Sequence, residues 1–433
     1  MATAPDMSLP KQVQQWSDLK GAYRLLNHPG VTPEAIQFEH RQQTLTRCGE
    51  HSIVLCVQDT TELDFTTRSR TRGLGMIGNG RGRGLVQHSA LAVTTEGGVL
   101  GVLDQRFVVR CESRADEKRA AAAGRWRESM LWGEAVERIG HPPSNCRLVV
   151  VADRAGDCFH AMHACVRMDA GFLIRAVRDR HVEDHADKLR SWAARLPVQA
   201  TATVTVGRQA KPWGEVVKTA RTAEVEIRFG EVTLDPPARS AYPPLRVWIV
   251  SARESSVPTA DKAEPVDWLL VCSEPVPDQA AARRMLAWYS RRWVIEEWHR
   301  ALKEGCQMEA SQLQEAPAIQ NLAAVLGVVA ARMLQLRDLA GDALREGHPQ
   351  AEDPEALRRT VPAVWIRVVA RHRNLEPSTL TPRQFWRAIA QRGGFLARKG
   401  DGRPGWKTIW RGWYDYRLMV EYAELARDPG SYG

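Results

Sequence analysis

One short segment carries the side-chain types that could grip a phosphate backbone beside a metal ion. The segment 287–303 contains no Pro or Gly and includes Tyr289, Arg292, Glu296 and Lys303. If it forms a single α-helix at about 100° per residue, these four side chains fall within an arc of roughly 60°. The phenol, guanidinium and ammonium groups can bind phosphates, and the carboxylate can bind a cation. The alternative is a solvated charged face, which is the commoner fate of such a stripe.

Two more carboxylates follow apolar runs that are typical of buried strands. Asp59 ends the run that begins at Ile53, and Asp153 follows the run 146–152. Ligands bind at strand ends in α/β sheets, although a single Asp there is more often a helix cap or a turn residue. Together with Glu296 they would give three hard oxygen donors, which suit Mg²⁺, with Mn²⁺ as a substitute. Two such ions about 4 Å apart can assist both the attacking and the leaving oxygen of a phosphodiester.

The composition is compatible with a nucleic-acid partner. The 433 residues include 60 Lys and Arg against 51 Asp and Glu, which gives a net charge of +9 and a pI near 9.3. A positive balance favours association with polyanions. The hydrophobic content of 44% is typical of a globular chain. The 15 Trp residues could stack on bases, although filling the core is their commoner use.

The cysteines and the apolar segments indicate the compartment. The eight Cys form no Cys-x-x-Cys pair, and no His pair has the spacing of a zinc site. We expect reduced, buried thiols in a cytoplasmic bacterial protein. The N-terminal residues lack the apolar stretch of a signal peptide. The most apolar helix, expected over 322–336, is shorter than the roughly 20 residues that cross a membrane, so no membrane partner is expected.

Periodicity divides the chain into an α/β part, a strand-rich part and a helical tail. Apolar runs predict strands at 53–59, 84–93, 98–104, 146–152 and 172–175, with helices over 115–139 and 156–168. Shorter alternating runs predict further strands at 201–206, 223–228, 245–250 and 268–271, joined by segments that contain Pro pairs. Helices dominate after about residue 276.

The glycines of 73–78 have the spacing of a dinucleotide-binding loop, but their context excludes that function. Such a loop follows an apolar strand and opens a helix. Here basic residues flank the glycines on both sides. We expect a basic loop between two strands, which either touches DNA phosphates or forms a mobile hairpin.

The residues of the first two paragraphs resemble the motifs of a known family. The pattern Tyr289-x-x-Arg292-x-x-x-Glu296-x₆-Lys303 resembles the YREK signature of bacterial cut-and-paste DDE transposases. This is the insertion-sequence four family, which includes the Tn-five transposase. The runs 58–61 and 153–157 resemble the motifs of the two catalytic Asp residues, and 116–118 and 393–402 also look familiar. The resemblance extends from about residue 21 to about residue 425.

The resemblance implies an α/β fold with an RNase H-like catalytic core. A β-rich insertion interrupts that core, and a helical dimerisation region follows it. The expected divisions are a DNA-binding remnant at 1–33, the core at 34–185 and 280–335, the insertion at 186–279 and the C-terminal region at 336–433. The resemblance also implies the catalytic metal ligands, which are Asp59, Asp153 and Glu296, with Mg²⁺ or Mn²⁺ as the cofactor.

DNA contacts are implied for six side chains, which are Arg175, Trp268, Tyr289, Arg292, Trp293 and Lys303. The family residue that Trp268 matches helps to hold a base that flips out during hairpin formation. Stacking of this kind is worth roughly 1–3 kcal/mol per base. On spacing alone, Trp268 is as well explained as an aromatic residue of a strand core.

The implied function is that of an active DNA transposase, an enzyme that works as a homodimer on double-stranded transposon ends and target DNA. One strand is hydrolysed, the freed 3′-OH forms a hairpin, the hairpin is opened, and the 3′-OH ends attack the target. The alternative is an N-terminally shortened, inactive regulator, because few residues precede the match at Gly21. Such a form is expected to bind transposon ends weakly and still to pair with another copy. A host nuclease is a third possibility.

Overall fold

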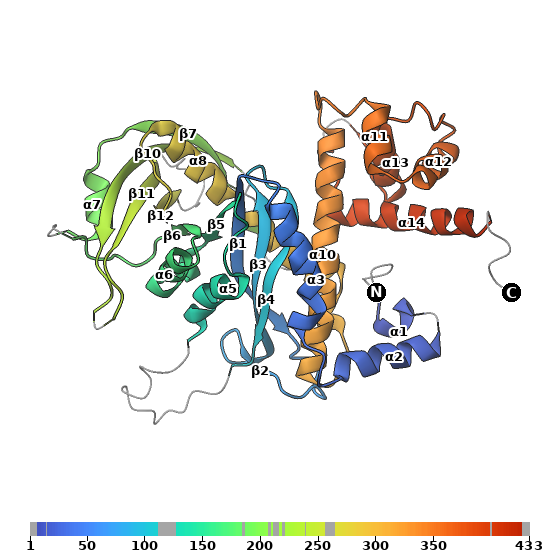
Figure 1. The fold of residues 1–433 in the computed structure, drawn as a ribbon, viewed down its shortest axis with the longest axis horizontal. Helices are drawn as coiled ribbons and strands as arrows, with labels where there is room; N and C mark the ends of the chain where they lie inside the picture. The colour runs from blue at the N-terminus through green and yellow to red at the C-terminus, as the bar shows by residue number, and fades with distance from the viewer. Residues whose placement is uncertain are drawn as a thin grey trace.

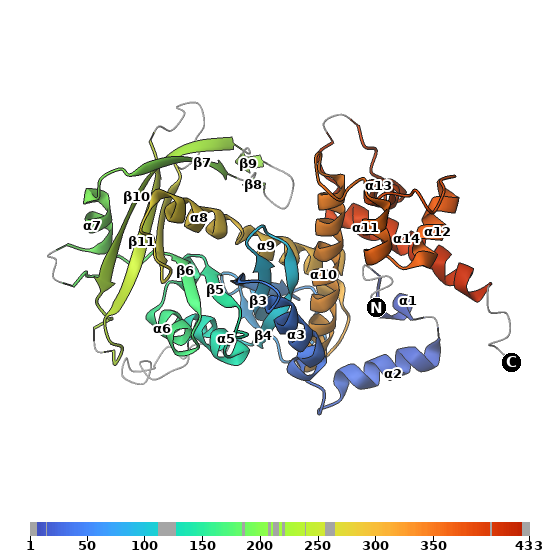
Figure 2. The same ribbon diagram turned by 45° about the horizontal axis from the view of Figure 1, so that its top comes forward.

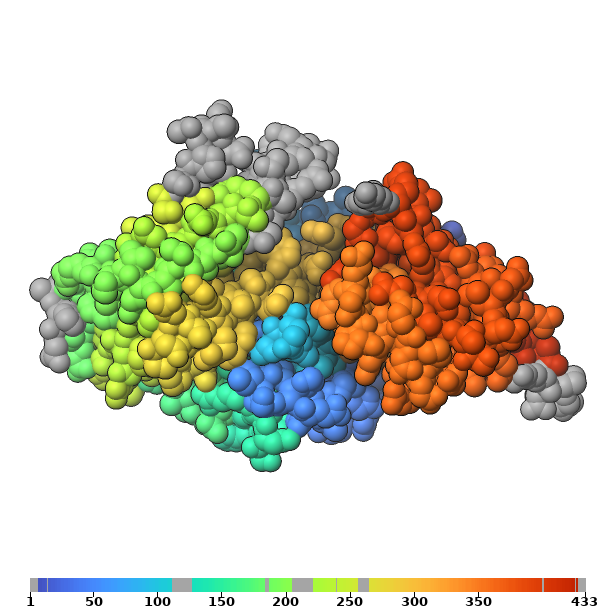
Figure 3. Space-filling view, turned by 90° about the horizontal axis from the view of Figure 1, so that it is seen from above, coloured from blue at the N-terminus to red at the C-terminus, as the bar shows by residue number. Residues whose placement is uncertain are grey.

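Three parts lie side by side in the computed structural model of the chain (Figure 1): a strand-rich lobe, a central α/β core and a helical C-terminal region. The structure describes residues 7–13, 15–110, 127–183, 187–206, 209–210, 216–218, 221–238, 240–255, 265–398 and 401–426. One ten-stranded sheet joins the lobe to the core, in the order β2-β3-β1-β5-β6-β12-β11-β10-β7, with β4 paired to β3. Figure 3 shows from above that the core lies between the other two parts.

The core half of the sheet combines antiparallel and parallel strands. β1 (Ile53–Asp64), β3 (Gly82–Thr94) and β4 (Val99–Val108) pair antiparallel. β5 (Arg147–Ala152) and β6 (Gly171–Arg175) continue on the other side of β1 as parallel strands. This arrangement, with helices on the sheet and a helical C-terminal region, confirms the predicted fold class with its RNase H-like core.

The strands of the predicted insertion extend the core sheet instead of forming a separate one. β12 (Asp267–Cys272) pairs antiparallel with β6, so that Leu270 lies opposite Arg175. The remaining elements of the lobe are β11 (Leu245–Glu254), β10 (Arg221–Leu234), β7 (Ala200–Val206), α7 (Leu189–Arg195) and a small hairpin of β8 (Gln209–Ala210) and β9 (Val216–Lys218). The lobe and the catalytic core are therefore joined by main-chain hydrogen bonds.

Helices cover both faces of the core sheet. On one face, α5 (Leu131–Ile139) and α6 (Phe159–Arg167) pack on the even-numbered side chains of β1 and β5. On the other face, α8 (Gln279–Ser290), α9 (Trp293–Arg300) and α10 (Ala316–Leu344) pack on the odd-numbered ones. Figure 2 shows that α8 and α9 lead from the lobe across the core to α10.

α10 is the long helix between the core and the C-terminal region. The prediction of a short helix over 322–336 is wrong, because α10 has 29 residues and is long and apolar enough to cross a membrane. However, 72% of its most apolar window is buried inside the structure. It packs against α3 (Pro33–Cys48), α9 and α14 (Trp406–Leu425). This burial is the mark of a core helix.

Shorter helices complete both ends of the chain. They are α1 (Leu9–Gln12), α2 (Trp16–Asn27), α11 (Pro354–Thr360), α12 (Ala363–His372) and α13 (Pro382–Arg392). In the C-terminal group, the Trp413 ring stacks on those of Trp365 and Trp386, with centroid distances of 4.0 and 5.6 Å. Several of the Trp residues thus fill a helical core.

The basic loop after β1 is anchored on both sides. β2 (Gly75–Ile77) pairs with β3 inside the loop. The main chain of Arg72 exchanges hydrogen bonds with Gln314 and Ala316, and the Arg68 guanidinium donates to the carbonyl of Ala310 at 3.2 Å. These bonds attach the loop to the segment that precedes α10.

Two other expectations concern residues that are described only in part. The predicted helix over 115–139 is described from residue 127 onward, and residues 116–118 lie outside the described residues. The seven cysteines in the described part are free and buried, as predicted, and Cys111 lies outside it.

Candidate active site

Asp59 and Asp153 occupy matching positions on two adjacent parallel strands. The last paired residues of β1 and β5 are Val57 and Val151. The same register, continued by two residues, sets Asp59 opposite Asp153. Adjacent strands lie about 4.8 Å apart, and alternate residues share a face of the sheet. Both Asp residues therefore belong to the face of Val57 and Val151, which is the face that α9 covers.

The carboxyl group of Asp59 is buried among other carboxylates. Its side chain is 18% exposed, and it accepts a hydrogen bond from the N–H of Thr60 at 2.8 Å. Burial raises the pKa of Asp59 to about 6, and the negative charges of Asp153 and Glu296 add to this rise. The three predicted ligands are thus close enough to interact electrostatically.

The segment 287–303 is not the single α-helix that the prediction assumed. α8 ends at Ser290, and a tight turn follows, in which the N–H of Arg292 donates to the carbonyl of Tyr289 at 3.0 Å. α9 ends at Arg300, and Ala301–Gly305 form a π-helical turn. Both turns change the angle between successive side chains, so the predicted arc of roughly 60° does not apply. No Pro or Gly in the segment predicts these two turns.

The polar side chains of this segment nevertheless lie against β1 and are not solvated. Arg292 is 15% exposed, with one guanidinium nitrogen 3.6 Å from Asp59 Oδ2 and the other donating to Glu296 Oε1 at 2.6 Å. Tyr289 is 5% exposed, and the Lys303 side chain is 26% exposed. The alternative of a solvated charged face is wrong for these residues.

The three carboxylates have the chemistry of a magnesium or manganese site, but they are not preassembled as one. Across the described ranges, no group of three His, Cys, Asp or Glu side chains is placed to hold a metal ion. Glu296 is bound to Arg292, and Asp153 accepts a hydrogen bond from the N–H of Ala155 at 2.8 Å. Their oxygen donors are nevertheless of the type that Mg²⁺ and Mn²⁺ prefer.

Lys303 lies against the far end of β1. Its ammonium donates to the carbonyl oxygen of Glu62 and lies 3.6 Å from the Glu309 carboxylate. Glu309 also accepts a hydrogen bond from the N–H of Asp64 at 2.9 Å. Glu62 and Glu309 thus position Lys303, and no signal in the sequence singles them out.

Three of the predicted DNA contacts meet where the lobe joins the core. The rings of Trp268 and Tyr289 pack edge to face, with centroids 5.2 Å apart. Burial raises the pKa of the Tyr289 phenol, whereas the charges of Arg292 and Arg175 oppose the rise. Arg175, at the end of β6, donates to the carbonyl of Asp267 at 3.0 Å. The half-buried Trp268 therefore packs on the core and still borders the candidate site.

Trp293 begins α9 beside this group. Its side chain is 40% exposed, so its ring is accessible to a ligand. The guanidinium carbon of Arg292 lies 5.7 Å from the centroid of the ring, which is within the range of a cation–π interaction.

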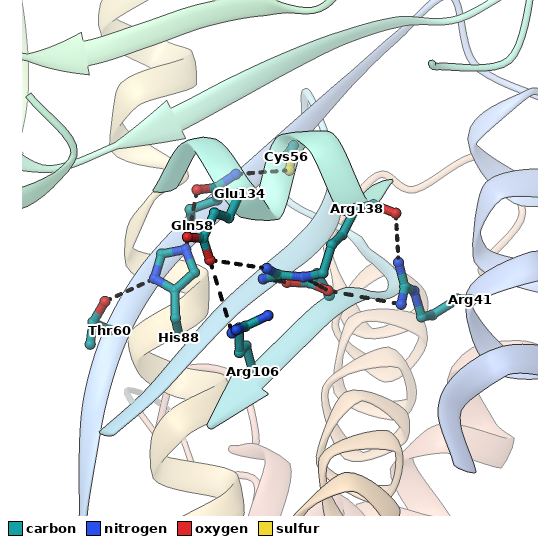
Figure 4. Close-up of polar contacts among 9 residues, drawn as sticks. Arg41, Cys56, Gln58, Thr60, His88, Arg106, Glu134 and Arg138 are labelled. Atoms are coloured by element: carbon teal, nitrogen blue, oxygen red, sulfur yellow. Dashed lines mark hydrogen bonds and ion pairs between the residues drawn. The ribbon is translucent and has the colours of Figure 1, made fainter. Parts of the chain in front are cut away.

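The opposite face of β1 carries a buried polar network (Figure 4). Beside Asp59, the hydroxyl of Thr60 lies 2.8 Å from His88 Nδ1, and His88 Nε2 lies 3.3 Å from Gln58 Oε1. Burial lowers the pKa of His88 to about 3, so the ring is neutral. These bonds hold the part of β1 that presents Asp59. The motif 58–61 predicts Asp59 as a metal ligand but does not reveal His88 on β3, which contacts Thr60 and Gln58.

Two further residues of the second Asp motif have structural roles. A Cβ at Gly156 would collide with Ala152 and with the Trp132 ring, so only glycine fits there. Asp157 is buried and accepts hydrogen bonds from the N–H groups of Val177 and Arg178, at 2.7 and 2.8 Å. Asp157 therefore braces the loop after β6.

Two family models match the ends of the chain. The model described as transposase DNA-binding matches residues 1–31, and the model described as Transposase Tn5 dimerisation domain matches residues 367–433. The matches support a Tn5-like transposase family, with DNA binding and dimer formation. The candidate active site lies between the two matched regions.

Proposed function

We propose that this protein is a DNA transposase whose metal-dependent phosphodiester chemistry depends on Asp59, Asp153 and Glu296. The observation that carries the proposal is that Asp59 within β1, Asp153 directly after β5 and Glu296 on α9 share one electrostatic neighbourhood. The matched DNA-binding and dimerisation models support DNA as the substrate and a second copy as the partner.

In this proposal, the cations around the carboxylates hold the DNA backbone. Arg292 lies beside Asp59, Arg175 lies near Tyr289 and Lys303 lies at the far end of β1. Each of these cations can pair with a phosphate. Trp268, with Tyr289 behind it, offers a ring on which an unpaired base can stack, an interaction worth roughly 1–3 kcal/mol. The DNA strand to be cut then lies over the Asp59–Asp153 edge.

Bound Mg²⁺ or Mn²⁺ would supply positive charge to the scissile phosphate and to the attacking oxygen. The protein holds the carboxylates and the phosphate in fixed positions relative to each other, and the N–H of Thr60 fixes the carboxylate of Asp59. Every step of transposition breaks one P–O bond at a phosphate and forms another. This holds for strand hydrolysis, hairpin formation, hairpin opening and strand transfer. One set of three carboxylates can therefore serve every step of cut-and-paste transposition.

Conservative amide substitutions of the carboxylates test this proposal. Asp153→Asn and Glu296→Gln are expected to abolish nicking of end-containing DNA with Mn²⁺, because losing a ligand costs several kcal/mol of transition-state stabilisation. DNA binding in a gel-shift assay should stay near the wild-type level, since the cationic contacts remain.

The matched control is Glu297→Gln, because Glu297 pairs with Arg337 and not with the Asp59 group. This variant should nick DNA like the wild type. Nicking by Asp153→Asn or Glu296→Gln at the wild-type rate would defeat the assignment. A wild-type protein that binds DNA and dimerises without nicking would instead be a regulator.

A further inference from the structure

Arg292 is placed among the carboxylates as an internal counter-ion. One guanidinium nitrogen donates to Glu296 Oε1 at 2.6 Å, and another lies 3.6 Å from Asp59 Oδ2. The Arg292 side chain is 15% exposed, so water screens these contacts poorly. A cation of the protein itself therefore neutralises two of the three proposed metal ligands.

A divalent cation needs the same oxygens that Arg292 holds. A divalent cation on Glu296 Oε1 or Asp59 Oδ2 would lie next to the Arg292 guanidinium, and the two positive charges repel each other where water screens them poorly. The arrangement seen here is the closed one, since no three donors in the described part of the chain are placed to hold a metal ion. Opening the site requires the guanidinium to find another partner.

A DNA phosphate is a suitable partner for the released guanidinium. Arginine binds phosphate through two parallel N–H groups, and a charged partner offsets the loss of the Glu296 contact. The guanidinium already lies 5.7 Å from the centroid of the exposed Trp293 ring, on the accessible side of α9. A short side-chain movement in that direction would free Glu296 and Asp59.

We propose that Arg292 keeps the carboxylates closed to a divalent cation until a DNA phosphate takes over its guanidinium. The inference rests on the proposed function, because it takes Asp59 and Glu296 to be metal ligands. Metal binding and DNA binding then favour each other, and by linkage the two effects are equal in size. Arg292 thus acts as a gate: it prevents the metal site from forming before DNA is bound.

Arg292→Met tests the proposal, since it removes the charge and keeps much of the side-chain length. The readout is Mn²⁺ affinity, measured by electron paramagnetic resonance with and without a short DNA duplex. In the wild type, the duplex should tighten Mn²⁺ binding by about 10-fold or more, within the usual range of coupling between sites. In Arg292→Met, Mn²⁺ should bind about 10-fold tighter without DNA, and the duplex should tighten it clearly less than in the wild type.

Two matched variants separate the gate from a general electrostatic effect. Lys303→Met removes a nearby cation that binds the Glu62 carbonyl and Glu309. If any nearby positive charge weakens Mn²⁺ binding, Lys303→Met will change the Mn²⁺ affinity as much as Arg292→Met does, and the gate is refuted. If the gate is correct, Lys303→Met keeps the response to DNA, and Arg292→Lys stays closer to the wild type than Arg292→Met does.

Glu296→Gln distinguishes failure of the gate from failure of the proposed function. This variant should lose Mn²⁺ binding with and without DNA. Unchanged Mn²⁺ affinity in Glu296→Gln would overturn the metal site and the gate together. Loss of binding in Glu296→Gln, combined with wild-type affinity in Arg292→Met, would overturn the gate alone.

Discussion

Burial keeps the histidines at positions 88 and 299 neutral in the folded protein. Burial lowers the pKa of each to about 3, from an ordinary value of 6.5. Because the unfolded chain binds these protons first, the stability that depends on neutral His88 and His299 is complete above about pH 6.5 and is lost as the pH falls toward about 3. We therefore expect the free energy of unfolding to fall on mild acidification, by up to about 1.4 kcal/mol per pH unit for each histidine.

Urea unfolding at a series of pH values from 7.5 to 5 measures this dependence. His88→Gln keeps a polar side chain beside Thr60 and Gln58 but cannot titrate, so the pH slope should fall by about one proton. An unaltered slope in His88→Gln would show that this histidine is not held neutral.

At the scale of elements, α13 and α14 pack through two glycines. A Cβ at Gly412 would fall on the carbonyl oxygen of Ile389, and one at Gly393 would fall on the carbonyl oxygen of Thr408. Gly412→Ala must push the helices apart, and overpacking of this kind costs about 1–3 kcal/mol. We expect lower thermal stability, together with faster proteolysis of the C-terminal region.

Gly405→Ala is the control for this prediction, because no atom lies within 4 Å of a Cβ at that position. Its melting temperature should stay near that of the wild type. If Gly412→Ala instead has the melting temperature of the wild type, the two helices are not in backbone contact.

The sequence is informative about strands and carboxylates and less so about how elements bend or join. Apolar runs correctly predict where β1 begins and where β5 lies, because burial on both faces requires continuous hydrophobic residues. The prediction that the first strand ends at Asp59 is wrong, since β1 continues to Asp64. The break between α8 and α9 has no local signal, since no Pro or Gly lies in the segment. The Arg292–Glu296 contact has the i,i+4 spacing that a helix brings together. The approach of Arg292 to Asp59 joins two distant elements, so it could not be predicted from helical spacing.

At the scale of the whole molecule, the cationic excess predicts binding to DNA that is strongly salt-dependent. The net charge is +9, and Arg175, Arg292 and Lys303 border the proposed path of the backbone. If the DNA contacts also involve the matched N-terminal region, about six phosphates are engaged, and affinity should fall by about 10³-fold between 50 and 200 mM salt. Fluorescence anisotropy with a labelled duplex measures this dependence.

Removing one phosphate contact should lower the slope of log affinity against log salt by about 1. Arg175→Met is expected to do so on any DNA sequence, since phosphate contacts carry no sequence information. An affinity that is flat with salt would mean that the charge excess does not face the DNA.

The contacts around β1 join residues far apart in the sequence, and this separation also determines when the candidate site can form during synthesis. The Lys303 ammonium bonds to a carbonyl 241 residues earlier in the chain, and Glu309 bonds to an N–H 245 residues earlier. Contacts this distant in sequence form late and slowly in folding. A growing chain can build the strands of Asp59 and Asp153 long before α9 leaves the ribosome. A polypeptide that stops short of α9 would therefore carry the sheet but lack Glu296 and Lys303, so the candidate site is complete only after synthesis has passed residue 309.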